Sequence, residues 1–298
     1  MKKYLAALAV FVVFFTVGSY ISTYMGGPSI SGVIKQIQKK DKVLLLIGVD
    51  ARNKNEPSRS DTIILAFFHP KLNRVDTISI PRDSRVDIPG EDRKRKINFA
   101  HAKGGVELLE ETLDQQFGVK PDRYIEIDFE GFEKAIDTLG GVEINVEKRM
   151  YYPEEGINVH KGLQTLDGHD ALGYVRYRSD GLGDIGRVER QQKFLRALAR
   201  QFFTGGGILK APSLYEEIKE YVKTDVEVSD ITSFARQFAE DPQVNSYMVP
   251  GEAQMISGGS YWVVDWDKTK KLIEQLKSGQ DPQTNTEEKP DGSNNTSK

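Results

Sequence analysis

Residues 42–83 read KVLLLIGVDARNKNEPSRSDTIILAFFHPKLNRVDTISIPRD, and they contain the strongest strand patterns of the chain. Its runs Val43–Val49 and Thr62–Phe68 are nearly continuous in apolar residues, which is typical of strands buried on both faces. Arg74–Ile80 alternates apolar and polar residues and ends at Pro81, so it predicts a third strand. The chain therefore begins its folded part, at Lys42, with three strands of one sheet.

Downstream of these strands, helical and strand patterns alternate. Apolar residues at helical spacing predict helices over Val106–Phe117, ended by Gly118, and over Phe129–Leu139, closed by two glycines. Later strands are expected at Val142–Val146, Tyr174–Arg178, Val244–Val249 and Tyr261–Val264, and later helices at 186–203, Leu214–Val222, Ile231–Phe238 and Lys268–Lys277. This alternation predicts an α/β fold in which a central β-sheet is flanked by helices on both faces. The patterns leave open whether the sheet is parallel or mixed.

The bulk composition narrows the class of protein. The 298 residues suit one large domain or two small ones, and 38% hydrophobic with 29% charged residues indicates a folded core. The formal net charge of −3 gives no reason to expect nucleic acid as a partner. The absence of cysteine excludes a disulfide framework, a thiolate nucleophile and cysteine-ligated metals.

The N-terminus predicts a membrane anchor. Tyr4–Met25 carries no charge, and a helix of this length crosses about 30 Å of hydrocarbon. A cleaved signal peptide is the alternative, but no convincing small-x-small cleavage site precedes Gly26 and the apolar stretch is longer than a usual signal core, so we expect an uncleaved helix. Lys2 and Lys3 abut the apolar run and place the body outside the membrane, although further lysines follow at a distance.

These features divide the chain into five parts. A tail dominated by polar residues with no large apolar side chain is expected to be disordered, because it cannot bury enough surface to order itself. The expected parts are the cytoplasmic end and transmembrane anchor at 1–25, a spacer at 26–41, the main domain at 42–205, a segment at 206–277 and the tail at 278–298. The segment 206–277 is either the end of the same fold or a small appendage.

Arginines and aspartates gather at the ends of the predicted strands, where open α/β sheets bind ligands. Asp50 ends the first strand, Arg59 and Asp61 precede the second, and Arg82 and Asp83 follow the third. Arg176 and Arg178 share one face of a predicted strand, where like charges repel unless an anion lies between them. Arg187, Arg190 and Gln191 open the predicted long helix on one face.

This inventory is what a pyrophosphate site needs. Arginine forks match phosphate oxygens, and one or two carboxylates together with substrate phosphates hold Mg²⁺. Each residue alone is more simply a turn, cap or solvated residue; Asp184, for example, fits the N-cap of the long helix. The pair His169–Asp170 stands without a second metal-ligating cluster, and the sequence contains no P-loop and no Gly-x-Ser-x-Gly motif.

An ordered set of motifs resembles the LytR–CpsA–Psr domain. The motifs are Leu46–Arg52 with Arg59–Thr62, Ser79–Asp83, Lys96–Asn98 with Gly104–Gly105, Gly162–Arg178, and Asp184–Gln192, and together they span about 42–203. The resemblance implies a membrane-anchored phosphotransferase. Such an enzyme moves a glycopolymer, such as wall teichoic acid, from a polyprenyl pyrophosphate carrier to a peptidoglycan hydroxyl. It implies a cell-membrane location with one span and an extracytoplasmic body, in a Gram-positive bacterium.

The resemblance also implies roles for individual residues. Asp50 and Asp61 would hold Mg²⁺ or Mn²⁺ on the pyrophosphate. The residues implied to contact its oxygens are Arg59, Arg82, Lys96, Arg176, Arg178, Arg187 and Gln192, with Arg190 and Gln191 as less certain members. Of these, Arg82, Arg178 and Arg187 are expected to act in catalysis together with Asp61. The general base is open between Asp61 and Asp184.

Two other functions remain possible from the sequence. A polyprenyl-lipid-binding scaffold of wall synthesis would keep the pocket without catalysis. A hydrolase of the same lipid pyrophosphate would use water as the acceptor with the same metal and arginines. Direct DNA binding is disfavoured by the apolar N-terminus and the net acidity.

Overall fold

A computed structural model describes residues 41–49, 60–177, 218–226 and 243–282, together with residues 190, 193–194 and 197–198. The expected anchor and all but the last residue of the expected spacer therefore lie outside the described residues, as do most of the expected helix at 186–203 and all of the one at Ile231–Phe238. No helix within the described residues is both long and apolar enough to span a membrane.

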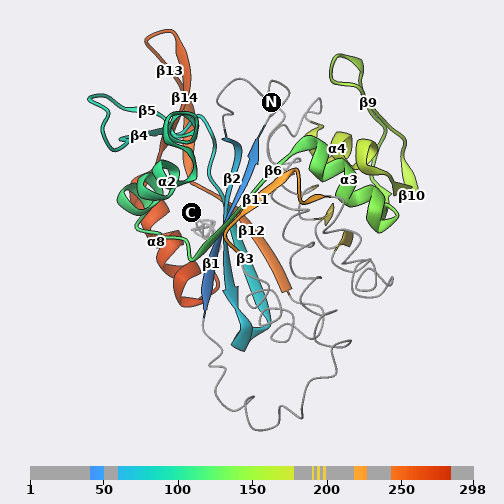
Figure 1. The fold of residues 1–298 in the computed structure, drawn as a ribbon, viewed down its shortest axis with the longest axis horizontal. Helices are drawn as coiled ribbons and strands as arrows, with labels where there is room; N and C mark the ends of the chain where they lie inside the picture. Colours follow the sequence, from blue (N-terminus) through green and yellow to red (C-terminus); the bar gives the residue numbers. More distant parts are fainter. Residues whose placement is uncertain are drawn as a thin grey trace, which may run out of the picture.

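The core of the molecule is a six-stranded mixed sheet (Figure 1). Its order is β11 (Val222–Thr224), β6 (Arg123–Asp128), β1 (Lys42–Val49), β2 (Ser60–His69), β3 (Arg74–Ser79) and β12 (Gln243–Met248). The pairs β1–β2, β2–β3 and β6–β11 are antiparallel, whereas β1–β6 and β3–β12 are parallel. The question of a parallel or mixed sheet is thus settled in favour of a mixed one.

Both faces of the sheet are buried, as the continuous apolar runs predicted. Every residue of β2 is buried, and so are the last six residues of β1. Because side chains alternate across a strand, Leu45 and Ile47 enter one apolar cluster while Leu44 and Leu46 enter the other. Burial of both faces explains why these strands lack the alternating pattern of a half-exposed strand.

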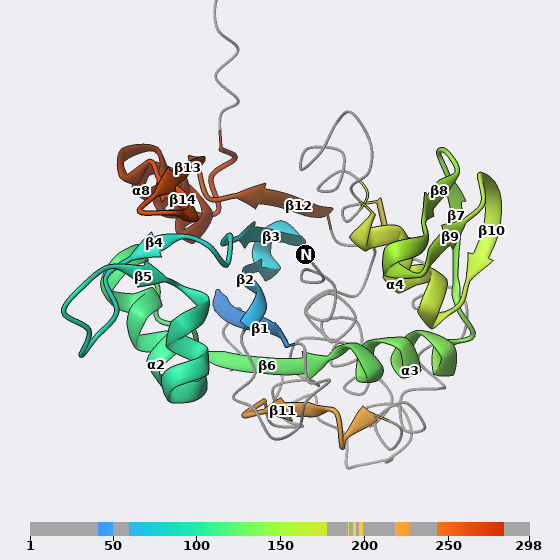
Figure 2. The same ribbon diagram turned by 90° about the horizontal axis from the view of Figure 1, so that it is seen from above.

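Helices cover both faces, which confirms the predicted architecture. On one face lie α2 (Asn98–Phe117) and α8 (Trp266–Ser278), and on the other lie α3 (Phe129–Leu139) and α4 (Gly168–Arg176). Figure 2 shows the two groups on opposite sides of the sheet. Helix α2 begins earlier than the apolar spacing predicted, and it is kinked at Gly104 and Gly105.

Four two-stranded sheets and two short 3₁₀ helices complete the described structure. The strand pairs are β4 (Arg85–Val86) with β5 (Arg95–Lys96), β7 (Val142–Val146) with β10 (Gly162–Leu166), β8 (Met150–Tyr152) with β9 (Ile157–Val159), and β13 (Gly251–Ile256) with β14 (Gly259–Val264). The 3₁₀ helices are η3 (Pro70–Leu72) and η4 (Pro153–Glu155). The hairpins β4–β5 and β13–β14 lie side by side in both views, joined by a bridge between Ser84 and Trp262.

The expected strand Tyr174–Arg178 is wrong as far as it is described, because α4 is helical to Arg176. The side chain of Asp167 caps this helix by accepting a hydrogen bond of 2.8 Å from the backbone N–H of Asp170. The short Tyr-Val-Arg-Tyr run has residue types that favour a strand. The N-cap at Asp167 and the packing of α4 against α3 together outweigh this strand preference. Arg176 therefore lies at the end of a helix.

The expected helix Leu214–Val222 is also corrected at its end. Ile218 is helical, but Val222 begins β11, which pairs with β6. Strand β6 itself was not predicted. The strands β11 and β12 belong to the central sheet and α8 packs into its apolar core, so the described parts of 206–277 are part of the same fold.

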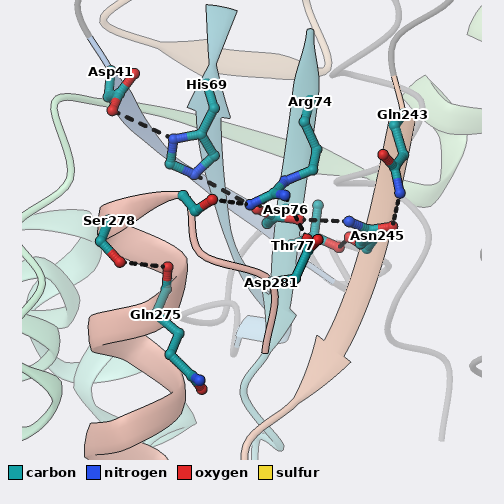
Figure 3. Close-up of polar contacts among 11 residues, drawn as sticks. Asp41, His69, Arg74, Asp76, Thr77, Gln243, Asn245, Gln275, Ser278 and Asp281 are labelled. Atoms are coloured by element: carbon teal, nitrogen blue, oxygen red, sulfur yellow. Dashed lines mark hydrogen bonds and ion pairs between the residues drawn. The ribbon is translucent and has the colours of Figure 1, made fainter. Parts of the chain in front are cut away.

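A buried polar network lies at the end of the sheet where β1 begins (Figure 3). Asp76 of β3 accepts hydrogen bonds of 2.9 Å from Arg74 Nε and from Asn245 Nδ2 of β12. His69 lies between two aspartates, with its Nδ1 at 3.4 Å from Asp41 Oδ2 and its Nε2 at 3.6 Å from Asp76 Oδ2. Arg74 also donates to the carbonyl of Gly279 and to Asp281, so the first residues of the expected tail contact the sheet.

Candidate active site

Asp61 and Arg82 form an ion pair at the end of the sheet where β3 stops. The antiparallel register of β2 and β3 pairs Ile64 with Ser79, and Ile80 extends it by donating to the carbonyl of Ile63. If the register of β2 and β3 continues beyond Ile63 and Ile80, Asp61 lies opposite Arg82. Arg82 Nη1 lies 3.1 Å from Asp61 Oδ1, and Asp61 is only 6% exposed. Two residues that the sequence placed at strand ends are thus brought together.

Lys96 and Asp83 extend this pair into a cluster of four charged side chains. Lys96 Nζ lies 2.8 Å from Asp83 Oδ1, and Asp83 Oδ2 lies 3.5 Å from Arg82 Nε. We call Asp61, Arg82, Asp83 and Lys96 the strand-end cluster. Two cations alternate in it with two carboxylates, so its formal charge is balanced before any ligand is considered.

The backbone around the strand-end cluster is fixed by segments that are distant in sequence. The carbonyl of Arg82 accepts a hydrogen bond of 3.2 Å from the N–H of Asn98 at the start of α2. The carbonyl of Asp83 accepts one of 2.9 Å from the N–H of Trp262 in β14. Lys96 Nζ lies 5.4 Å from the centre of the Tyr261 ring, within the range of a cation–π contact. The C-terminal segment therefore contributes to the site.

Arg176 and Arg190 are found in a second polar region, beside α4. Arg176 Nη2 lies 2.5 Å from Glu155 Oε2, and its side chain is largely buried. Arg190 donates a hydrogen bond of 2.8 Å to the carbonyl of Tyr177, and its Nη1 lies 3.7 Å from Glu147 Oε1. Each of these two arginines thus has a glutamate among its partners, Glu155 for Arg176 and Glu147 for Arg190. Nothing in the sequence singled out Glu147 or Glu155.

Tyr174 lies in the same region and is fully buried. Its hydroxyl donates a hydrogen bond of 3.0 Å to Glu147 Oε2. Burial, followed by the negative charge of Glu147, raises the pKa of Tyr174 far above its ordinary value. The phenol therefore stays protonated and acts as a fixed hydrogen-bond donor to Glu147.

Six predicted site residues lie outside the described residues. They are Asp50, Arg59, Arg178, Arg187, Gln191 and Gln192, and Asp184 lies there too. Within the described residues no three His, Asp or Glu side chains converge as metal ligands. Mg²⁺ needs only one or two protein carboxylates when phosphates supply other ligands, and the nearly buried carboxylate of Asp61 fits that requirement.

A buried acidic group lies on β6, under the first turns of α2. Glu126 Oε2 is 3.0 Å from His101 Nε2, and Glu126 Oε1 is 3.1 Å from Lys223 Nζ of β11. Burial alone would raise the pKa of Glu126, but the hydrogen bonds and charges of His101 and Lys223 outweigh it and lower the pKa. Glu126 is therefore ionised at neutral pH and joins α2 to the edge of the sheet.

The strand-end cluster is suited to binding an oxyanion. Arginine presents a planar set of donors that matches phosphate, and lysine adds a compact charge. A carboxylate beside them can hold a hard divalent cation. The cluster contains no hydroxyl or thiol nucleophile, and both of its carboxylates are paired with cations, so positioning and charge stabilisation are the chemistry that it is suited to supply.

Comparison with known proteins identifies the family. The model of the LytR_cpsA_psr family matches residues 22–278. The regulatory protein MsrR of Staphylococcus aureus is 38% identical over 211 residues, which cover 70% of this chain and 64% of MsrR. The chain thus spans slightly less than two thirds of that relative.

Two further relatives carry names that state an activity or a ligand. The polyisoprenyl-teichoic acid–peptidoglycan teichoic acid transferase TagU of Oceanobacillus iheyensis is 30% identical over 283 residues, covering 90% of this chain and 87% of TagU. The structure of TagT bound to LI-WTA shares the fold with a TM-score of 0.65 and 28% identity, covering 80% of this chain and 90% of TagT. With the family model matching most of its length, the chain belongs to the LytR_cpsA_psr family.

Proposed function

We propose that this chain is a membrane-anchored phosphotransferase that moves a glycopolymer from a polyprenyl pyrophosphate carrier to peptidoglycan. The observation that carries the proposal is the contact of Asp61 with Arg82, joined by Lys96, at the end of the central sheet. The name of TagU, a relative with 30% identity over most of both chains, supports teichoic acid as the kind of polymer. The anchor proposed at Tyr4–Met25 would keep the body beside its lipid-linked donor.

The reaction is a phosphoryl transfer without a covalent enzyme intermediate. An acceptor hydroxyl on peptidoglycan attacks the phosphorus that carries the glycan, and a new P–O bond forms. The P–O bond to the second phosphate breaks, so polyprenyl phosphate leaves with the bonding electrons. The proton of the hydroxyl passes to a base, for which Asp61 and Asp184 are the candidates.

The residues of the site would divide this work between them. Arg82 and Lys96 contact the pyrophosphate oxygens and stabilise the charge that grows on the leaving phosphate. Asp61 and Asp50 would hold Mg²⁺, or Mn²⁺, and a bound cation would neutralise pyrophosphate charge. Arg59, Arg178, Arg187 and Gln192 are proposed to complete the oxygen contacts.

Arg176 and Arg190 are proposed as further members of the anion site, with Gln191 next to Arg190. Both described arginines now contact glutamates, so a phosphate would have to compete with Glu155 and Glu147. A pyrophosphate carries more charge than one carboxylate, which favours the exchange when the donor binds.

The test is a transfer assay with the full chain in detergent micelles. The chain is incubated with a lipid-pyrophosphate glycan donor, Mg²⁺ and peptidoglycan oligomers, and the products are read by mass. We expect a phosphodiester-linked glycan on the acceptor, and its loss in Asp61→Ala. Lipid binding without product would instead favour a scaffold, and free phosphoglycan without labelled acceptor would favour a hydrolase.

A metal dependence follows from the same proposal. Because Asp61 and Asp50 are proposed to hold the cation, removal of divalent cations with a chelator should reduce transfer to background, and added Mg²⁺ should restore it. Initial rates at increasing free Mg²⁺ measure the dependence. Full activity in the chelator would show that the aspartates do not act through a metal.

A further inference from the structure

The strand-end cluster contains one residue whose role the proposed function leaves open. Asp83 reaches both cations of the cluster, with Oδ1 at 2.8 Å from Lys96 Nζ and Oδ2 at 3.5 Å from Arg82 Nε. Arg82 follows β3, and Lys96 lies in β5 beyond a hairpin loop. A single carboxylate thus connects two cationic side chains from different elements.

The backbone of Asp83 is held at the same time from the C-terminal segment. Its carbonyl accepts the N–H of Trp262, and the next residue, Ser84, forms a bridge with that tryptophan. The neighbouring Tyr261 ring lies under the Lys96 ammonium at 5.4 Å. The β13–β14 hairpin therefore contacts both the backbone of Asp83 and one of the two cations.

We propose that Asp83 is a positioning residue, which holds Arg82 and Lys96 in place for the pyrophosphate and is itself braced by the β13–β14 hairpin. The inference rests on the proposed function, because it assigns to Asp83 a part in the same site. Asp83 acts through the two cations and does not touch the substrate.

The physical reason is the cost of holding two long cationic side chains together. Arginine and lysine each lose rotamer freedom when they are fixed, and their like charges repel. A carboxylate between them offsets the repulsion and fixes both side chains before the donor arrives. The donor then binds a preformed site, and reacting groups that are held in place avoid the ordering cost.

The test compares Asp83→Asn and Asp83→Glu with wild type in the transfer assay, using the full chain. Asp83→Asn should lower kcat/KM for the lipid-linked donor by about 10-fold to 100-fold, in part through a raised KM. A small misplacement of binding groups has effects of that size. Asp83→Glu keeps the charge and should recover part of the loss. Asp87→Asn is the control, since Asp87 pairs at 3.3 Å with Lys94 on the same hairpin.

A double-mutant cycle separates positioning from a general structural role. If Asp83 acts through Lys96, then Asp83→Asn should cost much less in a Lys96→Met background than in wild type. A purely structural residue would give additive losses, and that result would overturn the proposal. Wild-type kinetics for Asp83→Asn would also overturn it.

A second variant keeps the proposal testable if Asp83→Asn fails to fold. Tyr261→Leu removes the ring beside Lys96 and should raise KM for the donor with a smaller effect than Asp83→Asn; an unchanged KM would contradict the brace. If the wild-type protein itself shows no transfer, the proposed function is wrong. If wild type is active but Asp83→Asn has no effect, or its effect is additive with that of Lys96→Met, only the inference about Asp83 is wrong.

Discussion

The ionised side chain of Glu126 shows how a single residue links stability to pH. The folded state lowers its pKa, so the carboxylate contributes stability above the unfolded pKa of about 4.3 and loses it as pH falls through the lower folded value. Glu126→Gln should therefore lower the free energy of unfolding by about 1–3 kcal/mol at pH 7. Urea unfolding at pH 7 and at acidic pH measures the difference.

The control for this prediction is Glu143→Gln, which changes an exposed glutamate of β7. It should leave stability nearly unchanged at both pH values. The gap between wild type and Glu126→Gln should narrow as the pH falls below the range in which Glu126 is ionised. A constant gap at all pH values would show that shape, and not charge, causes the loss.

At the residue scale, the sequence predicted charges at strand ends but not which charges would pair. Asp61 and Arg82 meet because of the β2–β3 register, which only the folded structure gives. The contacts of Asp83 with Lys96, and of Lys96 with Tyr261, depend on hairpins folded from distant segments. No local pattern reports such a contact.

At the scale of elements, the close approach of α3 and α4 depends on one glycine. A Cβ at Gly168 would lie 2.3 Å from the carbonyl oxygen of Glu133 in α3, which the backbone cannot accommodate without moving. Gly168→Ala should thus destabilise the fold by about 1–3 kcal/mol, the usual cost of overpacking. Thermal or urea unfolding measures the change.

Gly173→Ala is the matched control in the same helix. Its Cβ would lie 3.4 Å from Ile157 Cγ2, an ordinary contact, and alanine favours a helix over glycine by about 1 kcal/mol. This variant should be neutral or stabilising. Equal losses for Gly168→Ala and Gly173→Ala would indicate that helix propensity, and not the α3–α4 approach, governs both.

Helix α4 also marks where element prediction failed. Tyr174, Val175 and Tyr177 are residue types that favour strands, and the run is too short for a helical period to show. The signal that was available was Asp167, which caps the helix and precedes it. Helix α3, by contrast, was predicted to its ends because a full apolar face and terminal glycines coincide.

At the scale of the whole molecule, the two ends of the sheet carry different groups of polar residues. The strand-end cluster lies where β3 ends, and the polar network around Asp76 lies near the start of β3 (Figure 3). Asp76 is fully buried and accepts from Arg74 and Asn245. The network joins three strands and the C-terminal end of α8, so it serves stability.

Asp76→Ala should consequently lower the free energy of unfolding by about 3 kcal/mol or more, because it leaves the buried Arg74 without this partner. At temperatures where the variant is folded, its KM for the donor should equal that of wild type. Unfolding curves and transfer kinetics measure the two effects, with Asp114→Asn on the exposed side of α2 as control. A raised KM would show that the two ends are coupled.

The class of the fold was predictable because strand and helix patterns alternate downstream of the three opening strands. The order of the strands was not, since β11 and β12 join the sheet from far along the chain at opposite edges. Strand β6 was missed because Arg123 and Glu126 interrupt its apolar residues. Its Glu126 is tolerated by pairing with His101 and Lys223, which only the assembled sheet provides.

The part of the strand-end cluster in catalysis is measured by the transfer rate of Arg82→Ala, compared with that of Arg93→Ala, which changes an exposed arginine of the neighbouring hairpin. Both variants should keep a cooperative unfolding transition. The transfer rate of Arg82→Ala should be lower than that of wild type by about 100-fold or more, because the substitution removes a hydrogen-bond donor that points at the charge developing on the phosphate. Arg93→Ala should transfer as wild type does. Transfer by folded Arg82→Ala at the wild-type rate would contradict the assignment of the strand-end cluster as the pyrophosphate site.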